Sequence, residues 1–304
     1  MVREYADKEG KRLTKEEVQQ IPAGQLADRS GIPVQIVNDY ESLYEAVAEM
    51  MIEVILAKKD EKVTMILPVG PTGQYPLFAA KIRERKISLK NLWTFNMDEF
   101  LDRNGRTIPA SHPMSFRNIM MEEFYNRIPE ELRMPLEQMY FPRHDNMEEI
   151  DKAVDLHAPE GVDLCIAGVG PEGHIAFNED PNFRHVEVEE EEFLNDRTRL
   201  VLVNTSTVDM DALVAGCGDR SEVPPFAVSV GPHDILRAKR IEAVFFAGSW
   251  QRTPLRETLF RTPTMHFPGS LLKMRKTSGG KLVRQNVRVW ATPIESGTVF
   301  SRTM

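Results

Sequence analysis

Residues 63–73 read VTMILPVGPTG, a short apolar run with β-branched side chains that stops at a turn rich in proline and glycine. A helical pattern follows from Leu77 to Arg85. This order predicts a buried strand, a glycine-rich turn and then a helix, which together form a building unit of a parallel sheet. Further apolar runs of the same kind occupy residues 92–96, 162–168, 200–203, 241–247 and 287–291.

Helical patterns lie between several of these runs, for example at Asn118–Ile128. Strands that alternate with helices predict an α/β fold, Rossmann-like, with a mostly parallel sheet and helices on both faces. In such sheets, ligands bind outside the carboxyl ends of the strands. The residues that follow each strand are therefore the candidates for function.

The first 33 residues are polar and lack clear periodicity, apart from a short helix expected near Lys15–Gln20. We expect residues 1–33 to form an N-terminal extension that packs against a neighbouring subunit or remains disordered. Residues 34–304 are expected to form a single domain, since apolar runs and helical patterns continue through them.

Two smaller predictions concern local structure. Asn38, with Glu41 three residues later, predicts the N-terminal cap of a helix. His233 and Asp234 are adjacent, and side chains at i and i+1 do not face each other on a helix, so we expect this pair at the surface.

The composition excludes several classes of protein. The chain has 304 residues, with 38 Lys and Arg against 46 Asp and Glu, a net charge of −8 that disfavours general nucleic-acid binding. No stretch approaches the ~18 apolar residues of a membrane span, and the charged start lacks the apolar region of a secretory signal. Two cysteines exclude a disulfide scaffold. We expect a soluble, cytoplasmic protein.

The turn after the first strong strand has the composition of an anion site. Gly70 and Gly73 allow the backbone to approach a ligand, Thr72 adds a hydroxyl, and the start of the following helix favours negative charge. It matches neither the Walker loop nor the dinucleotide fingerprint. A plain structural turn is the alternative interpretation.

Two carboxylates, Asp98 and Glu99, follow the strand at residues 92–96. One of them could be a general base, because partial burial raises a carboxylate pKa toward the operating pH. The alternative interpretation is a pair that caps the start of a helix.

The sequence GVGPEGHIAFNED, residues 168–180, follows the strand at 162–168. Gly170 and Gly173 predict a tight turn, and Glu172, His174 and Glu179 lie within eight positions of one another. A histidine flanked by carboxylates can be oriented and tuned for proton transfer. The alternative is a buried structural histidine.

Five stretches identify a family. They are LPVGPTGQYP (67–76), TFNMDEF (94–100), SHPMSF (111–116), GVGPEGHIAFNE (168–179) and VPPFAVSVG (223–231). In these the chain resembles the glucosamine-6-phosphate deaminases, which share a superfamily with the 6-phosphogluconolactonases. The lactonases' Gly-His turn is not typically followed by Ala-Phe-Asn-Glu, which favours the deaminase branch.

The resemblance implies the conversion of glucosamine 6-phosphate to fructose 6-phosphate and ammonia, without a metal or an organic cofactor. Asp98 would move a proton between C1 and C2 of the open-chain sugar. His174 would assist ring opening, and Glu179 would orient His174. The implied partner is a small-molecule sugar phosphate, with no nucleic acid or membrane, and the chain could form a homo-oligomer.

The chain also departs from the family pattern. Glu172 stands where the family usually has aspartate, although a role in the proton relay is still expected. Leu213 or Val214 falls near the position of a phosphate-binding arginine, and Arg252 could replace a second phosphate-binding cation. An altered substrate is therefore expected. The expected substrate-binding residues are Gly70, Thr72, Gly73, Glu99, Gly170, Gly173, His112 and Arg252.

Two alternatives to the isomerase and deaminase remain open. One is a lactone hydrolase of the same superfamily that uses His174 as its base. The other is a non-catalytic sugar-phosphate sensor, which the missing phosphate arginine motivates.

Overall fold

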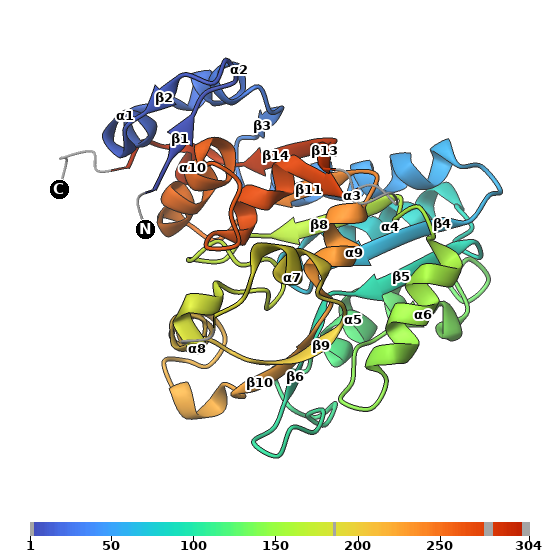
Figure 1. Cartoon of the computed structure of the whole chain (residues 1–304). Helices are drawn as coiled ribbons and strands as arrows, with labels where there is room; N and C mark the ends of the chain where they lie inside the picture. The colour runs from blue at the N-terminus through green and yellow to red at the C-terminus, as the bar shows by residue number, and fades with distance from the viewer. Residues whose placement is uncertain (1–2, 185–186, 277–281, 300–304) are drawn as a thin grey trace.

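A seven-stranded sheet forms the centre of the structure, and each pair of neighbouring strands in it is parallel (Figure 1). The computed structural model describes residues 3–184, 187–276 and 282–299. The predicted α/β fold with a mostly parallel sheet is confirmed. In sheet order the strands are β3 (Val34–Ile36), β14 (Val287–Ala291), β11 (Ile241–Val244), β8 (Leu164–Gly168), β4 (Val63–Leu67), β5 (Leu92–Asn96) and β7 (Met139–Tyr140).

Helices connect most of these strands. The α-helices are α1 (Lys15–Gln20), α2 (Leu26–Ser30), α3 (Tyr40–Ala57), α4 (Gln74–Arg85), α5 (Phe116–Glu123), α6 (Met147–His157), α7 (Glu190–Asn195), α8 (Thr205–Val214), α9 (Pro232–Arg237), α10 (Arg252–Phe260) and α11 (Pro293–Ser296). The 3-10 helices are η1 (Ala23–Gln25), η2 (Tyr125–Arg127), η3 (Leu136–Gln138), η4 (Pro181–Arg184), η5 (Arg220–Glu222), η6 (Ser249–Gln251) and η7 (Pro268–Lys273). None of the helices in the described ranges has the length and apolar character that a bilayer crossing requires.

Both faces of the parallel sheet are covered. Met65 and Leu67 of β4 belong to a buried cluster that includes side chains of α3, α4 and α5. Ile66, which lies between them, belongs to a second cluster with side chains of α6, α9 and α10. Because a strand buried on both faces has no polar side, β4 reads as a continuous apolar run in the sequence.

A second, antiparallel sheet has the strand order β6 (Asp98–Leu101), β10 (Phe226–Ser229) and β9 (Arg199–Leu202). The run at residues 200–203 was expected among the strands of the parallel sheet, and it forms β9 here instead. Leu200 and Leu202 are 45% and 48% exposed, whereas Val201 between them is buried. This alternation is typical of an antiparallel strand with one solvated face. Two short hairpins, β1 (Tyr5–Ala6) with β2 (Arg12–Leu13) and β12 (Met274–Lys276) with β13 (Leu282–Arg284), complete the strands.

The N-terminal segment packs on the core of its own chain, beside α10 (Figure 1). Its α1 has the predicted bounds, and Val18, Ile21 and Leu26 are each at most 2% exposed. The carbonyl oxygen of Ile21 accepts a hydrogen bond of 2.8 Å from Nη2 of Arg256. The expected disorder is wrong for residues 3–33, because their apolar side chains complete the core of this chain, whereas packing against a neighbouring subunit stays a prediction.

The start of α3 differs by one residue from the prediction. Asp39, rather than Asn38, is the N-cap, and its carboxylate accepts a hydrogen bond of 2.8 Å from the backbone N–H of Ser42. Both residue types cap helices well, so the sequence alone could not separate these neighbours.

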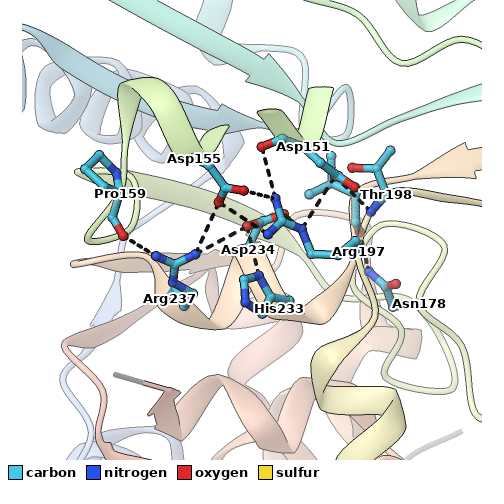
Figure 2. A network of polar contacts seen from close by, with 10 residues as sticks. Asp151, Asp155, Pro159, Asn178, Arg197, Thr198, His233, Asp234 and Arg237 are labelled. Atoms are coloured by element: carbon cyan, nitrogen blue, oxygen red, sulfur yellow. Dashed lines mark hydrogen bonds and ion pairs between the residues drawn. The ribbon is translucent and has the colours of Figure 1, made fainter. Parts of the chain in front are cut away.

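A network of charges joins α6, α9 and the segment before β9 (Figure 2). Nη2 of Arg197 lies 3.2 Å from Oδ2 of Asp155, and its Nε lies 3.4 Å from Oδ2 of Asp234. Nδ1 of His233 is 3.1 Å from Oδ1 of Asp234. The Asp234 side chain is fully buried, so the expected surface position is wrong for it. Asp234 lies in the first turn of α9, and its side chain points into the protein toward Arg197.

We expect Asp234→Asn to lower the free energy of unfolding by about 2 kcal/mol, because the buried carboxylate loses its charge while Arg197 keeps Asp155 as a partner. The matched control is Asp209→Asn, which breaks an ion pair with Arg220 in which both side chains are more than half exposed. We expect the control to cost at most about 1 kcal/mol. Urea unfolding of both variants measures the difference, and equal losses would contradict a structural role for the network.

Candidate functional site

A cavity of about 360 Å³ lies at the carboxyl ends of β4, β5, β8 and β11. Its wall is built by the segments that follow these strands, together with one face of α8 and residues at the start of α5. This is the position that the sheet topology predicted for a ligand. Of the predicted site residues, the cavity wall contains Gly70, Thr72, Asp98, Gly170 and His174.

Asp98 is the first residue of β6 and lies between the two sheets. The backbone N–H of Met97 donates to the carbonyl oxygen of Leu67 at 3.0 Å, and that of Val230 donates to the Met97 oxygen at 2.7 Å. Asp98 pairs with Ser229 in the antiparallel register and is 8% exposed. Burial raises the pKa of Asp98 well above its usual value, and the charges of nearby carboxylates raise it further.

Glu99 points away from the cavity, because successive side chains of a strand face opposite sides. Its carboxylate accepts hydrogen bonds from the backbone N–H groups of Phe116 at 3.0 Å and Arg117 at 2.8 Å, at the start of α5. It also accepts one from Phe100 at 2.9 Å. Glu99 therefore caps a helix and lies off the cavity wall in this structure, and its expected substrate-binding role stays a prediction.

The His174 ring packs directly over the backbone of Gly170. A Cβ atom at Gly170 would lie 2.0 Å from Cε1 of His174, so this position requires glycine. Gly173 has φ +81°, and a Cβ atom there would meet the ring of Phe267 at 2.5 Å. Gly173 therefore shapes the turn, whereas Gly170 lies on the cavity wall.

Thr207, which the sequence analysis did not identify, connects His174 with Glu179. Its Oγ1 lies 2.6 Å from Oε1 of Glu179 and 3.4 Å from Nδ1 of His174. The hydroxyl can donate to the carboxylate and accept from Nδ1–H, which orients the imidazole. Glu179 also accepts a hydrogen bond of 2.9 Å from the backbone N–H of Asn204, at the cap of α8. The predicted orienting role of Glu179 can thus act through Thr207.

Burial lowers the pKa of His174 to about 4, and the charge of Glu172 opposes this shift. The imidazole is therefore neutral at pH 7. Glu172 does not lie on the cavity wall, and its Oε2 is buried without a hydrogen-bond partner among the described residues. The expected role of Glu172 in the proton relay stays a prediction. It is supported by the effect of the Glu172 charge on the pKa of His174.

The glycine loop before α4 reaches the cavity only in part. Thr72 lies on the wall, but its hydroxyl donates to the carbonyl oxygen of Val69 at 2.5 Å. A Cβ atom at Gly73 would lie 2.4 Å from the Tyr44 ring. Gly73 therefore permits helix packing and does not reach the wall, contrary to its expected role in binding.

Two further expected binding residues, His112 and Arg252, lie off the cavity wall. Nδ1 of His112 accepts a hydrogen bond of 3.1 Å from the backbone N–H of Met114. Nε of Arg252 donates to the Ile294 carbonyl oxygen at 2.8 Å, and Nη1 donates to that of Thr298 at 3.3 Å. The Arg252 guanidinium therefore holds the C-terminal segment and does not reach the wall in this structure, and its expected phosphate role stays a prediction.

Asp211 is a third ionisable group on the wall, after Asp98 and His174, and the sequence analysis missed it. It lies on α8 four residues after Thr207, and Val214 follows on the same face. Burial raises the pKa of Asp211 to about 7, and the charge of Glu179 raises it as well. The signal that could have identified Thr207 and Asp211 is their helical spacing. Leu213, the other residue considered in this segment, is 72% exposed.

The neutral His174 predicts how stability depends on pH. An unfolded histidine takes up its proton near pH 6.5, whereas the folded one does so near pH 4, so stability falls as the pH drops between these values. We expect the wild type to lose about 2 kcal/mol more than His174→Gln between pH 7 and pH 5. Urea unfolding at several pH values measures this difference.

The control is His144→Gln, at an exposed histidine. It should keep the pH dependence of the wild type. Parallel stability curves for the wild type and His174→Gln would contradict a depressed pKa at His174.

Sequence comparison finds relatives that share one name, glucosamine-6-phosphate deaminase. A scan of known family models finds no match. The chain is 28% identical over 244 residues to glucosamine-6-phosphate deaminase 2 of Bacillus subtilis, covering 79% of this chain and 90% of the relative. It is 25% identical over 248 residues to the glucosamine-6-phosphate deaminase of Clostridioides difficile, covering 80% and 90%.

Solved structures show the same fold. A monomeric glucosamine-6-phosphate deaminase superposes with a TM-score of 0.70 at 22% identity, over 88% of this chain and all of that one. The 6-phosphogluconolactonase of Trypanosoma cruzi superposes with a TM-score of 0.61 at 16% identity, over 89% and 97%. The chain is therefore a divergent homologue of the proteins named glucosamine-6-phosphate deaminase, with the fold that the 6-phosphogluconolactonases also have.

Proposed function

We propose that the protein converts an amino sugar from aldose to ketose and releases ammonia, with Asp98 as the proton-transfer base and His174 assisting ring opening. The observation that carries the proposal is that both side chains lie on the wall of one cavity, at the carboxyl ends of the parallel strands. The names of the relatives support the same reaction type. Those names specify glucosamine 6-phosphate, which is the first substrate to test.

Ring opening needs a group that takes a proton from the anomeric hydroxyl and returns one to the ring oxygen. His174 is suited to this, because its lowered pKa keeps it neutral and able to accept a proton. With Nδ1 next to Thr207, Nε2 is left for exchange with the sugar. Packing of the His174 ring over the backbone of Gly170 holds the ring in place.

Isomerisation then needs a base that removes the proton from C2 and delivers one to C1. The Asp98 carboxylate accepts the C2 proton, a C1–C2 double bond forms, and the C1=O double bond becomes a single bond whose oxygen takes up a proton. Return of a proton to C1 leaves an imine at C2. Water adds to this imine to give a carbinolamine, which releases ammonia and leaves the ketose. The raised pKa of Asp98 makes its carboxylate a stronger base for the first step.

Replacement of Asp98 by Asn tests the base directly. We expect ammonia and ketose formation to fall by about 10²–10⁴-fold, since the amide cannot accept the proton, while the shape of the cavity is kept. Product formation is measured with glucosamine 6-phosphate and glucosamine as substrates. Asp145→Asn, at an exposed carboxylate that pairs with Arg143, is the control and should keep full activity.

The same experiment separates the alternatives. A lactone hydrolase with His174 as its base would keep turnover of its lactone and lose mainly binding in the Asp98 variant. A sensor would bind sugar saturably in the wild type and form no product. Either result would contradict the proposed reaction.

The contact of Thr207 with His174 predicts a further effect. We expect Thr207→Val, which keeps the shape but removes the hydroxyl, to lower kcat/KM by about 10–100-fold, the value of a lost hydrogen bond to a buried group. Thr207→Ser keeps the hydroxyl and should stay within a few-fold of the wild type. Equal losses in the two variants would show that packing rather than the hydroxyl matters.

A further inference from the structure

The cavity wall carries two carboxyl groups and no cationic side chain among its described residues. Asp98 and Asp211 are its two carboxylates, and its histidine, His174, is neutral at pH 7. No lysine or arginine side chain belongs to the wall. Aromatic and aliphatic side chains, such as Phe246 and Trp250, make up much of the remainder. A dianionic group placed here would find two carboxyl groups, a neutral imidazole, apolar surface and the backbone of the turn at residues 70–72, but no cationic side chain.

Three arginines on elements next to the cavity, Arg117, Arg199 and Arg252, are held elsewhere. Arg117 stacks over the Phe141 ring, with its guanidinium carbon 5.7 Å from the ring centroid. Nε of Arg199 lies 2.9 Å from Oδ2 of Asp196. Arg252, as described above, is bonded to carbonyl oxygens of the C-terminal segment. None of these three side chains belongs to the wall.

Two neutral side-chain donors on the wall, those of Thr72 and Gln251, are also engaged. The Thr72 hydroxyl donates to the Val69 oxygen. The Gln251 side chain, which is 1% exposed, donates to the carbonyl oxygen of Val169 at 2.9 Å. Its own oxygen accepts from the backbone N–H groups of Phe246 and Ala247, each at 2.7 Å. These bonds tie together the loops after β8 and β11 and leave the amide unavailable to an anion.

We propose that the substrate of this cavity is an amino sugar without a phosphate group, and that Asp211 binds a hydroxyl or ammonium group of it. This inference rests on the proposed function and adds the substrate class to it. A buried phosphate without a cation loses its hydration and gains no compensating charge. A hydroxyl or ammonium group, by contrast, can donate to the Asp211 carboxylate.

The first experiment compares two compounds that differ in the phosphate alone. Ammonia release is measured with glucosamine and glucosamine 6-phosphate, and calorimetry measures binding of their open-chain alcohols, 2-amino-2-deoxyglucitol and its 6-phosphate. We expect the unphosphorylated compound to have at least about 10-fold higher kcat/KM and affinity, which corresponds to about 1.4 kcal/mol. Equal or better binding of the phosphorylated alcohol would overturn the inference.

The second experiment tests Asp211. We expect Asp211→Asn to weaken binding of the unphosphorylated alcohol and to strengthen binding of the phosphorylated one, so that their affinity ratio narrows by about 10-fold. Asp209→Asn, on the same helix with an exposed carboxylate, should leave the ratio unchanged. An unchanged ratio in a folded Asp211 variant would overturn the role of Asp211, and the wild-type comparison stands if that variant does not fold.

The outcomes separate the two proposals. Turnover of glucosamine 6-phosphate in preference to glucosamine would support the reaction and overturn the substrate class. Preferred binding of the unphosphorylated alcohol without turnover of either sugar would support the substrate class and overturn the reaction. Failure of both alcohols to bind would overturn both.

Discussion

Two backbone hydrogen bonds at Met97 determine where the ionisable groups of the site lie. Its N–H donates to Leu67 in the parallel sheet, and its carbonyl oxygen accepts from Val230 next to the antiparallel sheet. The chain therefore passes from one sheet to the other at this residue. As a result, Asp98 lies on the cavity side and Glu99 on the opposite side, where it caps α5. The rest of the site is arranged around this crossing.

The electrostatics of the site follow from burial among carboxylates. In an apolar cavity the charged form of each group is disfavoured, which raises the pKa of Asp98 and Asp211 and lowers that of His174. The result is a strong carboxylate base and a neutral imidazole on the wall of one cavity. Burial in this cavity, whose described residues include no cationic side chain, also makes the binding of a further negative charge unfavourable. The proposed reaction and the proposed substrate class therefore have the same physical cause.

Much of the fold could be predicted because buried parallel strands leave a clear signal, and the bounds of β4 and β5 agree with the apolar runs in the sequence. Asp98 and His174 were identified because they follow strands in long matching motifs. Thr207 and Asp211 were missed although α8 follows β9, because β9 belongs to the antiparallel sheet and no sequence motif marks the cavity face of this helix. Arg252 was assigned to phosphate from its sequence position, but a side-chain direction is set by packing, which sequence position does not reveal.

The central claim is that the site moves the proton at C2 of an amino sugar. The most direct measurement follows glucosamine, and in parallel its 6-phosphate, labelled with deuterium at C2 during incubation with the full chain. The account predicts that deuterium leaves C2, to C1 or to solvent, and that the reaction is slower than with the unlabelled sugar. Retention of the label at C2 in both sugars during prolonged incubation would contradict the claim.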